Sequence, residues 1–169
     1  MKEAGFLGEV GLLSIDIDGN DYWVWEKLTA INPVIVIVEY NSIFGSDLAV
    51  TIPYHPNFAR HQAHYSGQFW GASLTALTQL AEKKGYSPVG CNSAGNNAYF
   101  VRKDKIDNLP VLTAKEAFVD ARFRDSRDKT GKLNYLTGAQ RFQAIADLEV
   151  YDLRQNRTVP LISLRNTSS

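Results

Sequence analysis

The feature that most constrains the fold is an unbroken run of β-branched residues, Val34-Ile35-Val36-Ile37-Val38, directly after Asn32-Pro33. β-Branched residues favour strands, and an apolar run without alternation is typical of a strand covered on both faces, as in a parallel sheet. A second apolar segment, residues 12 to 17, precedes it. Between them lies a predicted helix that begins after Asn20, with apolar positions at helical spacing: Val24, Leu28 and Ile31. Strand, helix and strand with short connections predict a βαβ unit and an α/β fold.

The remaining segments predict further helices and hairpins. Ser73 is placed to cap a helix over residues 74 to 85. Threonine capping boxes predict two more helices, and strand-like segments separated by turn residues predict two hairpins. The expected helices cover residues 113 to 124 and 137 to 147, and the expected strand pairs are 86 to 92 with 97 to 103 and 150 to 153 with 159 to 164.

Charge and composition exclude several classes of partner. The 169 residues carry 18 basic and 18 acidic side chains, so the formal net charge is zero and there is no electrostatic footprint for nucleic acid or for an anionic membrane. The single cysteine and the absence of a signal-peptide pattern or an 18-residue apolar stretch favour a cytoplasmic location. The partner expected from the sequence is a small molecule.

Acidic and amide side chains follow both strands of the predicted βαβ unit. Asp16 and Asp18 end the first strand, and Glu39 and Asn41 end the second. Because parallel strands present their carboxyl ends at the same edge, neighbouring strands would bring these groups within about 5 Å of one another. All-oxygen ligands suit a hard cation such as Mg²⁺, Ca²⁺ or Mn²⁺. The sequence predicts a metal or catalytic site at this edge.

A purely structural interpretation of the same residues stays open. Asp18 and Asn20 could cap the following helix, with Asp21 in its first turn, and Glu39 could accept backbone amides. If the edge binds substrate instead, the candidate contacts come from the acidic turn, from the second strand end and from the long segment 41 to 70, which has the length of a binding loop. These candidates are Asn20, Asp21, Tyr40, Tyr65 and Trp70.

The long segment also carries all three histidines. His61 and His64 are three residues apart, a spacing that can place two ligands on one helical face. Zinc binding is one interpretation. A general acid or base beside the carboxylate edge is the other, and it is favoured here.

Three segments together resemble the C-terminal half of FkbM-type class I S-adenosylmethionine-dependent methyltransferases: "LLSIDIDGNDYWVW", "PVIVIVEYNS" and "GASLTALTQLAEKKGYSPVGCNSAGNNAYFVRKD". The resemblance covers residues 1 to 104. It implies a partial Rossmann-like methyltransferase sheet, made of a parallel βαβ unit and an antiparallel hairpin, with a helical C-terminal extension over residues 105 to 169 packed on it. The positions that match the family's acidic strand ends are Asp16, Asp18, Gly19, Glu39 and Asn41.

The glycine-rich loop that holds the methyl donor in such enzymes has no counterpart in this sequence. S-Adenosylmethionine would bind only if a missing half were supplied. Three functions remain open: a methyltransferase-like domain acting on a small hydroxylated molecule, a metal-assisted hydrolase of esters, lactones or glycosides, and a noncatalytic interaction domain. In the first two, Asp16 and Asp18 hold a cation or orient the substrate, and Glu39, His61 or His64 moves the proton.

The resemblance also implies an unpaired strand edge. In the parent sheet, the strand that matches residues 11 to 17 pairs with a strand that this sequence lacks. An exposed apolar edge invites strand addition. We expect this edge to mediate homo-oligomer formation or to bind a partner chain, or else to be covered by the protein's own C-terminal segment.

Overall fold

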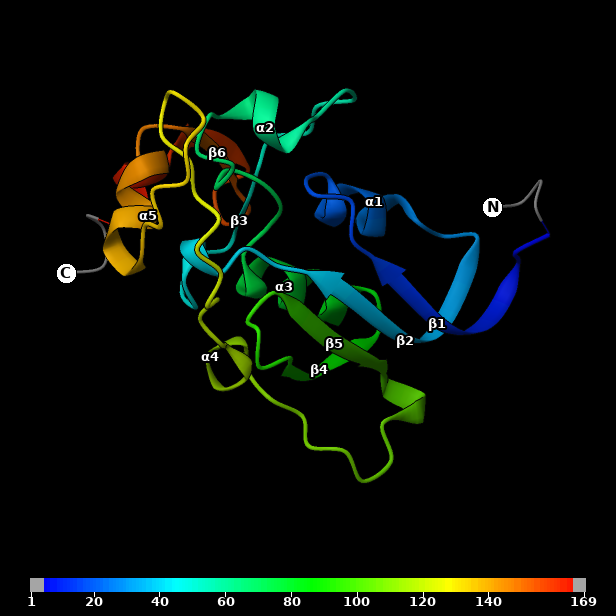
Figure 1. Cartoon of the computed structure of the whole chain (residues 1–169). Helices are drawn as coiled ribbons and strands as arrows, with labels where there is room; N and C mark the ends of the chain where they lie inside the picture. Colours follow the sequence, from blue (N-terminus) through cyan, green and yellow to red (C-terminus); the bar gives the residue numbers. More distant parts are fainter. Residues whose placement is uncertain (1–4, 166–169) are drawn as a thin grey trace.

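The computed structural model describes residues 5 to 165 and contains two β-sheets (Figure 1). The larger sheet has the order β1-β2-β5-β4, with β1 (Gly8–Ile15), β2 (Ile31–Glu39), β5 (Asn97–Arg102) and β4 (Tyr86–Cys91). β1 and β2 are parallel, and the β4–β5 hairpin continues the sheet in antiparallel pairing. The α/β class is therefore confirmed, as a mixed sheet that joins a βαβ unit to a hairpin.

The smaller sheet is entirely antiparallel, in the order β3-β6-β7. Its strands are β3 (Val50–Thr51), β6 (Glu149–Asp152) and β7 (Arg157–Pro160). The predicted last hairpin is confirmed as β6 and β7. It pairs with a strand from the long segment 41 to 70, so the C-terminal extension completes a sheet that begins in the first half of the chain.

The helices are short, and three of them begin at the capping residues predicted from the sequence. They are α1 (Asp21–Lys27), α2 (Arg60–Ala63), α3 (Leu74–Lys83), α4 (Ala114–Ala117) and α5 (Gly138–Ile145), with 3₁₀ turns at Ser42–Phe44, Lys103–Lys105 and Leu161–Leu164. The Ser73 hydroxyl accepts a hydrogen bond from the Ala76 amide at 3.1 Å, as expected for the start of α3. Thr113 and Thr137 both form capping boxes.

The predicted helix over residues 113 to 124 is wrong in its length. It ends at Ala117, and Phe118 already has extended backbone angles. Residues 118–125, which we name the covering segment, run from α4 toward α5 and are coloured yellow-green to yellow in Figure 1. The helix stops because the amides beyond it bond to side chains at the end of β2 instead of to the preceding turn.

The buried face of α1 also differs from the prediction. Val24 is 43% exposed, whereas Tyr22 and Trp25 are buried, and β2 already begins at Ile31. The Trp25 ring lies 5.1 Å from the ring of Phe100 on β5. Two large aromatic side chains bury more apolar area than the aliphatic positions, so they decide which face of this two-turn helix meets the sheet.

The main core lies on one face of the larger sheet. Val36 and Val38 are fully buried against α1 and α3, whereas Ile35 and Ile37 on the opposite face stay partly exposed. The expectation that this strand is covered on both faces is therefore wrong. The β-branched run forms a central strand as predicted, but only one of its faces is packed by helices.

The outer edge of β1 has no strand beside it within residues 5 to 165. Leu12, on this strand, is 54% exposed, and Ile17, just beyond its end, is 51% exposed. The described part of the C-terminal segment, up to residue 165, does not cover this edge as the alternative expected, because its strands pair with β3 in the other sheet. Within the same part of the chain, no helix is both long and apolar enough to cross a bilayer.

Candidate functional site

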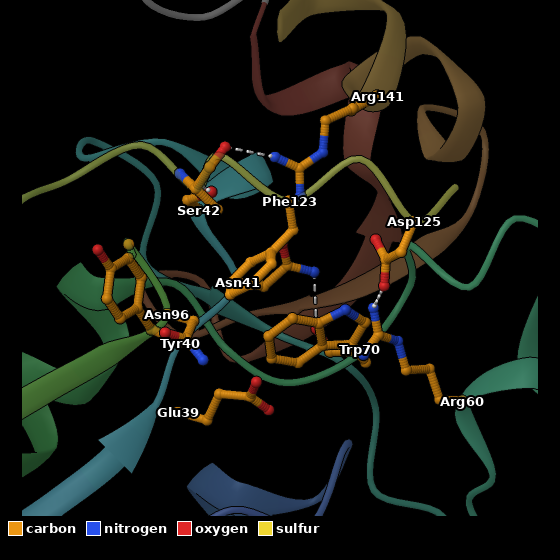
Figure 2. A pocket seen from close by; sticks show the side chains of 12 residues that line it. Glu39, Tyr40, Asn41, Ser42, Arg60, Trp70, Asn96, Phe123, Asp125 and Arg141 are labelled. Atoms are coloured by element: carbon orange, nitrogen blue, oxygen red, sulfur yellow. Dashed lines mark hydrogen bonds and ion pairs between the residues drawn. The ribbon is translucent and has the colours of Figure 1, made fainter. Parts of the chain in front are cut away.

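A pocket of about 150 Å³ lies at the carboxyl end of β2 (Figure 2). Its walls come from the end of β2, from the long segment before α3, from the β4–β5 turn, from the covering segment and from α5. The lining residues are Glu39, Tyr40, Asn41, Ser42, Arg60, Trp70, Gly95, Asn96, Ala121, Phe123, Asp125 and Arg141. Four residues predicted for the site, Glu39, Tyr40, Asn41 and Trp70, are among them.

The parallel pairing of β1 and β2 brings the two acidic strand ends together, as the sequence predicts. Ile15 is opposite Val38, so the next residues along the two strands are neighbours: Asp16 directly follows β1, and Glu39 is the last residue of β2. The charges of Asp16, Asp18 and Asp21 all act on Glu39. This juxtaposition follows from strand order and register alone.

Asp21 organises the acidic turn that follows β1. It is fully buried, and its two carboxylate oxygens accept the amides of Ile17 at 3.0 Å and Gly19 at 2.9 Å. Burial raises the pKa of Asp21, although these backbone bonds act in the opposite direction. Asp21 does not line the pocket. Its place in the structure is that of a support for the turn.

The other residues of the turn reach into the long segment. Asn20 does not cap α1 with its side chain, which instead donates to the carbonyl of His55 at 2.8 Å. Asp18 has a positive φ of 55° and forms an ion pair with Arg60 at 3.1 Å. The Phe58 side chain packs directly against Gly19. A β-carbon at position 19 would lie only 2.2 Å from the phenyl ring, so a larger residue would clash there.

Glu39 has the electrostatics of a proton acceptor. It is 7% exposed, and its Oε2 atom has no hydrogen-bond partner among the described residues. Burial, followed by the charges of Asp16, Asp21 and Asp18, raises the pKa of Glu39 to about 8, and a hydrogen bond from Asn96 opposes this rise. Figure 2 shows the carboxyl group below Trp70, at one end of the pocket.

Asn41 is fully occupied by hydrogen bonds within the protein. Its amide nitrogen donates to the carbonyls of Gln68 and Trp70, both at 3.0 Å, and its amide oxygen accepts the Ile43 amide at 3.1 Å. All three bonds are buried. Asn41 thus ties the end of β2 to the chain that returns toward α3, and it holds the Trp70 wall in place.

The covering segment closes one side of the pocket through polar contacts. The Tyr40 hydroxyl donates to the Val119 carbonyl at 2.6 Å, and the Ser42 hydroxyl accepts the Ala121 amide at 3.0 Å. Burial raises the pKa of Tyr40. Gly95, with a φ of +77°, is necessary for the approach, because a β-carbon there would lie 2.7 Å from the Ala121 nitrogen.

Two arginines line the pocket, and they differ in their ion-pair and hydrogen-bond partners. Arg60 forms ion pairs with Asp18 and Asp125, each at 3.1 Å, and stacks over Trp70 with its guanidinium carbon 4.9 Å from the ring centroid. Arg141 is buried and donates to the Gln68 side chain at 2.9 Å and to the Ala121 carbonyl at 3.2 Å. Burial lowers the pKa of Arg141.

The histidine set and Tyr65 lie outside the pocket. His61 is exposed on α2, and His64 bonds through Nδ1 to the Ser66 hydroxyl at 2.8 Å. Burial, and then the charge of Lys129, lowers the pKa of His64. The Tyr65 ring is 4.2 Å from the ring of His64. The structure therefore does not bring His61, His64 or Tyr65 together with Glu39.

The proposed cation ligands are spread over different environments. Asp16 is exposed, Asp18 is paired with Arg60, and the side chain of Asn41 is engaged with the backbone. Between residues 5 and 165, no group of three or more His, Cys, Asp or Glu side chains is placed to share a metal ion. We therefore derive no reaction step from a cation.

Several pocket residues carry no obvious signal in the sequence. They are Ser42, Arg60, Asn96, Phe123, Asp125 and Arg141. Among these residues, Arg141 alone occupies a position that the sequence could have indicated. It lies on the same face of α5 as Ile145, four residues later, and both are buried. A charged residue on an apolar helix face is a usable signal for a buried polar site.

Comparison of the chain with protein-family models, with curated proteins and with solved structures finds no match.

Proposed function

We propose that the chain carries the acceptor site of a methyltransferase-like protein and binds a small hydroxylated molecule in the pocket. The observation that supports this most directly is the Glu39 carboxyl, which lines the pocket, has one oxygen without a partner among the described residues and has a pKa of about 8. A carboxylate with a pKa near the working pH is suited to take a proton from a hydroxyl. Trp70 and Phe123 supply an apolar wall for the rest of the molecule.

Glu39 acts as a general base toward the acceptor hydroxyl. The O–H bond breaks, the proton passes to a Glu39 oxygen, and the electron pair stays on the acceptor oxygen, which becomes the nucleophile. The neighbouring charges of Asp16, Asp18 and Asp21 support this step, because they raise the proton affinity of Glu39. Asn96 bonds to the same carboxyl and orients it.

S-Adenosylmethionine, the donor that the family resemblance implies, supplies an electrophilic methyl group. The pocket of about 150 Å³ does not fit it, because sites for molecules of that size usually measure at least about 300 Å³. The sequence has no glycine-rich turn that would hold it elsewhere. The proposal is therefore limited to the acceptor, and no step is assigned to the donor.

Calorimetric titration with 4-methylphenol and with its O-methylated form, 4-methylanisole, tests this function. At about pH 9, where Glu39 is ionised, we expect the phenol to bind roughly tenfold more tightly, because only the phenol can donate a charge-assisted hydrogen bond. Glu39→Gln should reduce this preference. Glu149→Gln is the matched control, since Glu149 is an exposed carboxylate on β6 that does not line the pocket. Equal binding of the two compounds would contradict the proposal.

We further propose that the bare edge of β1 mediates self-association. Leu12→Lys places a charge on this apolar edge and should shift a concentration-dependent dimer toward monomer, because charged side chains block edge-to-edge strand addition. Val111→Lys, at a similarly exposed site outside any strand, is the control. Sedimentation velocity over a range of concentrations measures the effect. A monomer at all concentrations for the unaltered protein would exclude this interface.

A further inference from the structure

Arg141 has unused hydrogen-bonding capacity and no carboxylate in direct ion-pair contact among the described residues. A guanidinium has five N–H donors, and the bonds to Gln68 and Ala121 use two, so three remain. Among residues 5 to 165, no carboxylate lies within ion-pair distance of Arg141. Figure 2 shows its guanidinium end pointing from α5 toward Phe123 and the pocket interior. A buried cation without a partner is costly unless an anion compensates it.

Arg60 is less available than Arg141 to bind an anionic ligand. Its two terminal nitrogens are held by Asp18 and Asp125, and its Nε donates to the Gly67 carbonyl at 2.6 Å. The positive charge of Arg60 is therefore balanced by direct ion pairs, whereas Asp120 and Asp125 act on Arg141 only from beyond ion-pair distance. If an anionic group enters this pocket, Arg141 is the residue that can receive it.

The two ends of the pocket have opposite electrostatic character. Glu39 lies at one end, within the field of Asp16, Asp18 and Asp21, and Arg141 lies at the other in Figure 2. An anionic group is repelled from the Glu39 end and attracted to the Arg141 end. A ligand that carries both a hydroxyl and a negative charge can therefore bind in only one orientation.

We propose that the ligand of this pocket is a small hydroxylated carboxylate, bound with its carboxylate group on Arg141 and its hydroxyl at Glu39. This inference rests on the proposed function and specifies its substrate class. A carboxylate matches the planar guanidinium in geometry. Asp120 and Asp125 also act on Arg141, and their charges disfavour a doubly charged phosphate more than a singly charged carboxylate.

The volume of the pocket limits the size of this ligand. A cavity of about 150 Å³ is large enough for one benzene-sized ring. An aromatic hydroxy acid such as 4-hydroxybenzoate is of this size. Its ring would lie against the side chains of Trp70 and Phe123, which line the pocket between the two polar ends (Figure 2).

Three probes titrated into the unaltered protein separate the carboxylate subsite from the hydroxyl subsite. They are 4-hydroxybenzoate, its methyl ester and benzoate, each measured by calorimetry. We expect the acid to bind at least about tenfold more tightly than the ester, because a charge-assisted bond to Arg141 is lost in the ester. Equal binding of acid and ester would overturn the carboxylate subsite and leave the role of Glu39 standing. Equal binding of 4-hydroxybenzoate and benzoate would instead overturn the proposed function.

Substitutions at two arginines complete the test. Arg141→Gln should abolish the preference for acid over ester, whereas Arg157→Gln, which removes the same charge from an exposed residue on β7 outside the pocket, should preserve it. Far-UV circular dichroism establishes whether Arg141→Gln is folded. If it is not, the comparison of acid and ester on the unaltered protein still decides the outcome. Failure of all three probes to bind would overturn both the inference and the proposed function.

Discussion

Replacement of Glu39 by glutamine is expected to stabilise the protein by roughly 4 kcal/mol at about pH 9 and to leave its stability nearly unchanged at about pH 4. The pKa of Glu39 is about 8 in the folded protein, against a reference value of 4.5. The folded state therefore binds this proton more strongly than the unfolded chain does. The stabilising effect of protonation is complete below the unfolded pKa and is lost as the pH rises through the folded pKa. Glutamine does not titrate, so the variant escapes this loss.

Urea denaturation across this pH range measures the effect of Glu39→Gln. Glu149→Gln is the matched control, because Glu149 is an exposed carboxylate on β6 that lies outside the pocket. We expect the control to show no comparable gain in unfolding free energy at alkaline pH. A gain for Glu39→Gln that is the same at acid and alkaline pH would show that burial does not raise the pKa of this group.

The second large effect is expected for Asn41→Ala, which should reduce the free energy of unfolding by at least about 3 kcal/mol. The substitution leaves the carbonyls of Gln68 and Trp70 and the amide of Ile43 buried without their partner. Each such orphaned group costs about 1 to 3 kcal/mol. Thermal or urea unfolding measures the loss, and Asn57→Ala, at an exposed site, should change stability by less than about 0.5 kcal/mol.

The same experiment separates a structural role of Asn41 from the role of a metal ligand. A structural role predicts the same loss of stability with EDTA and with added Mg²⁺. If Asn41→Ala were neutral in EDTA and destabilising only relative to a Mg²⁺-stabilised protein, the structural interpretation would be overturned and a cation at the acidic edge would be favoured.

The sequence is sufficient to predict the parts of the fold that depend on local patterns. The β-branched run forms β2, and the capping serine begins α3. The meeting of Asp16 with Glu39 follows from the parallel pairing of two adjacent strands. In each case, the position of a residue depends on its neighbours in the sequence or in the adjacent strand. Such neighbours produce a sequence pattern with a period of two residues in strands or 3.6 residues in helices.

The rest of the pocket depends on contacts between distant residues, which leave no periodic pattern. Arg141 meets Gln68 across 73 positions, and Tyr40 meets Val119 across 79. The covering segment is helical by local propensity but extended in the structure, because its amides bond to the side chains of Tyr40 and Ser42, just after β2. Tertiary hydrogen bonds here override the local preference, as they commonly do when a helix is short.

The hydrogen bonds of the acidic turn differ from the predicted ones for a similar reason. Asn20 is a residue type that favours the N-cap position, yet its side chain binds the backbone of His55. Asp21 turns back to the amides of Ile17 and Gly19. Both arrangements satisfy the turn, and the choice depends on the position of the long segment, which the sequence pattern does not specify.

The residues that line the pocket are widely separated in the sequence, from Glu39 to Arg141, so they are synthesised at different times. Domains fold as units while the chain emerges from its N-terminal end. The last strand of the larger sheet ends at Arg102, and Arg141 follows 39 residues later. A nascent chain can therefore complete this sheet and expose Glu39 at its edge before the covering segment and α5 exist. The binding site is therefore completed only after the sheet that carries Glu39 has folded.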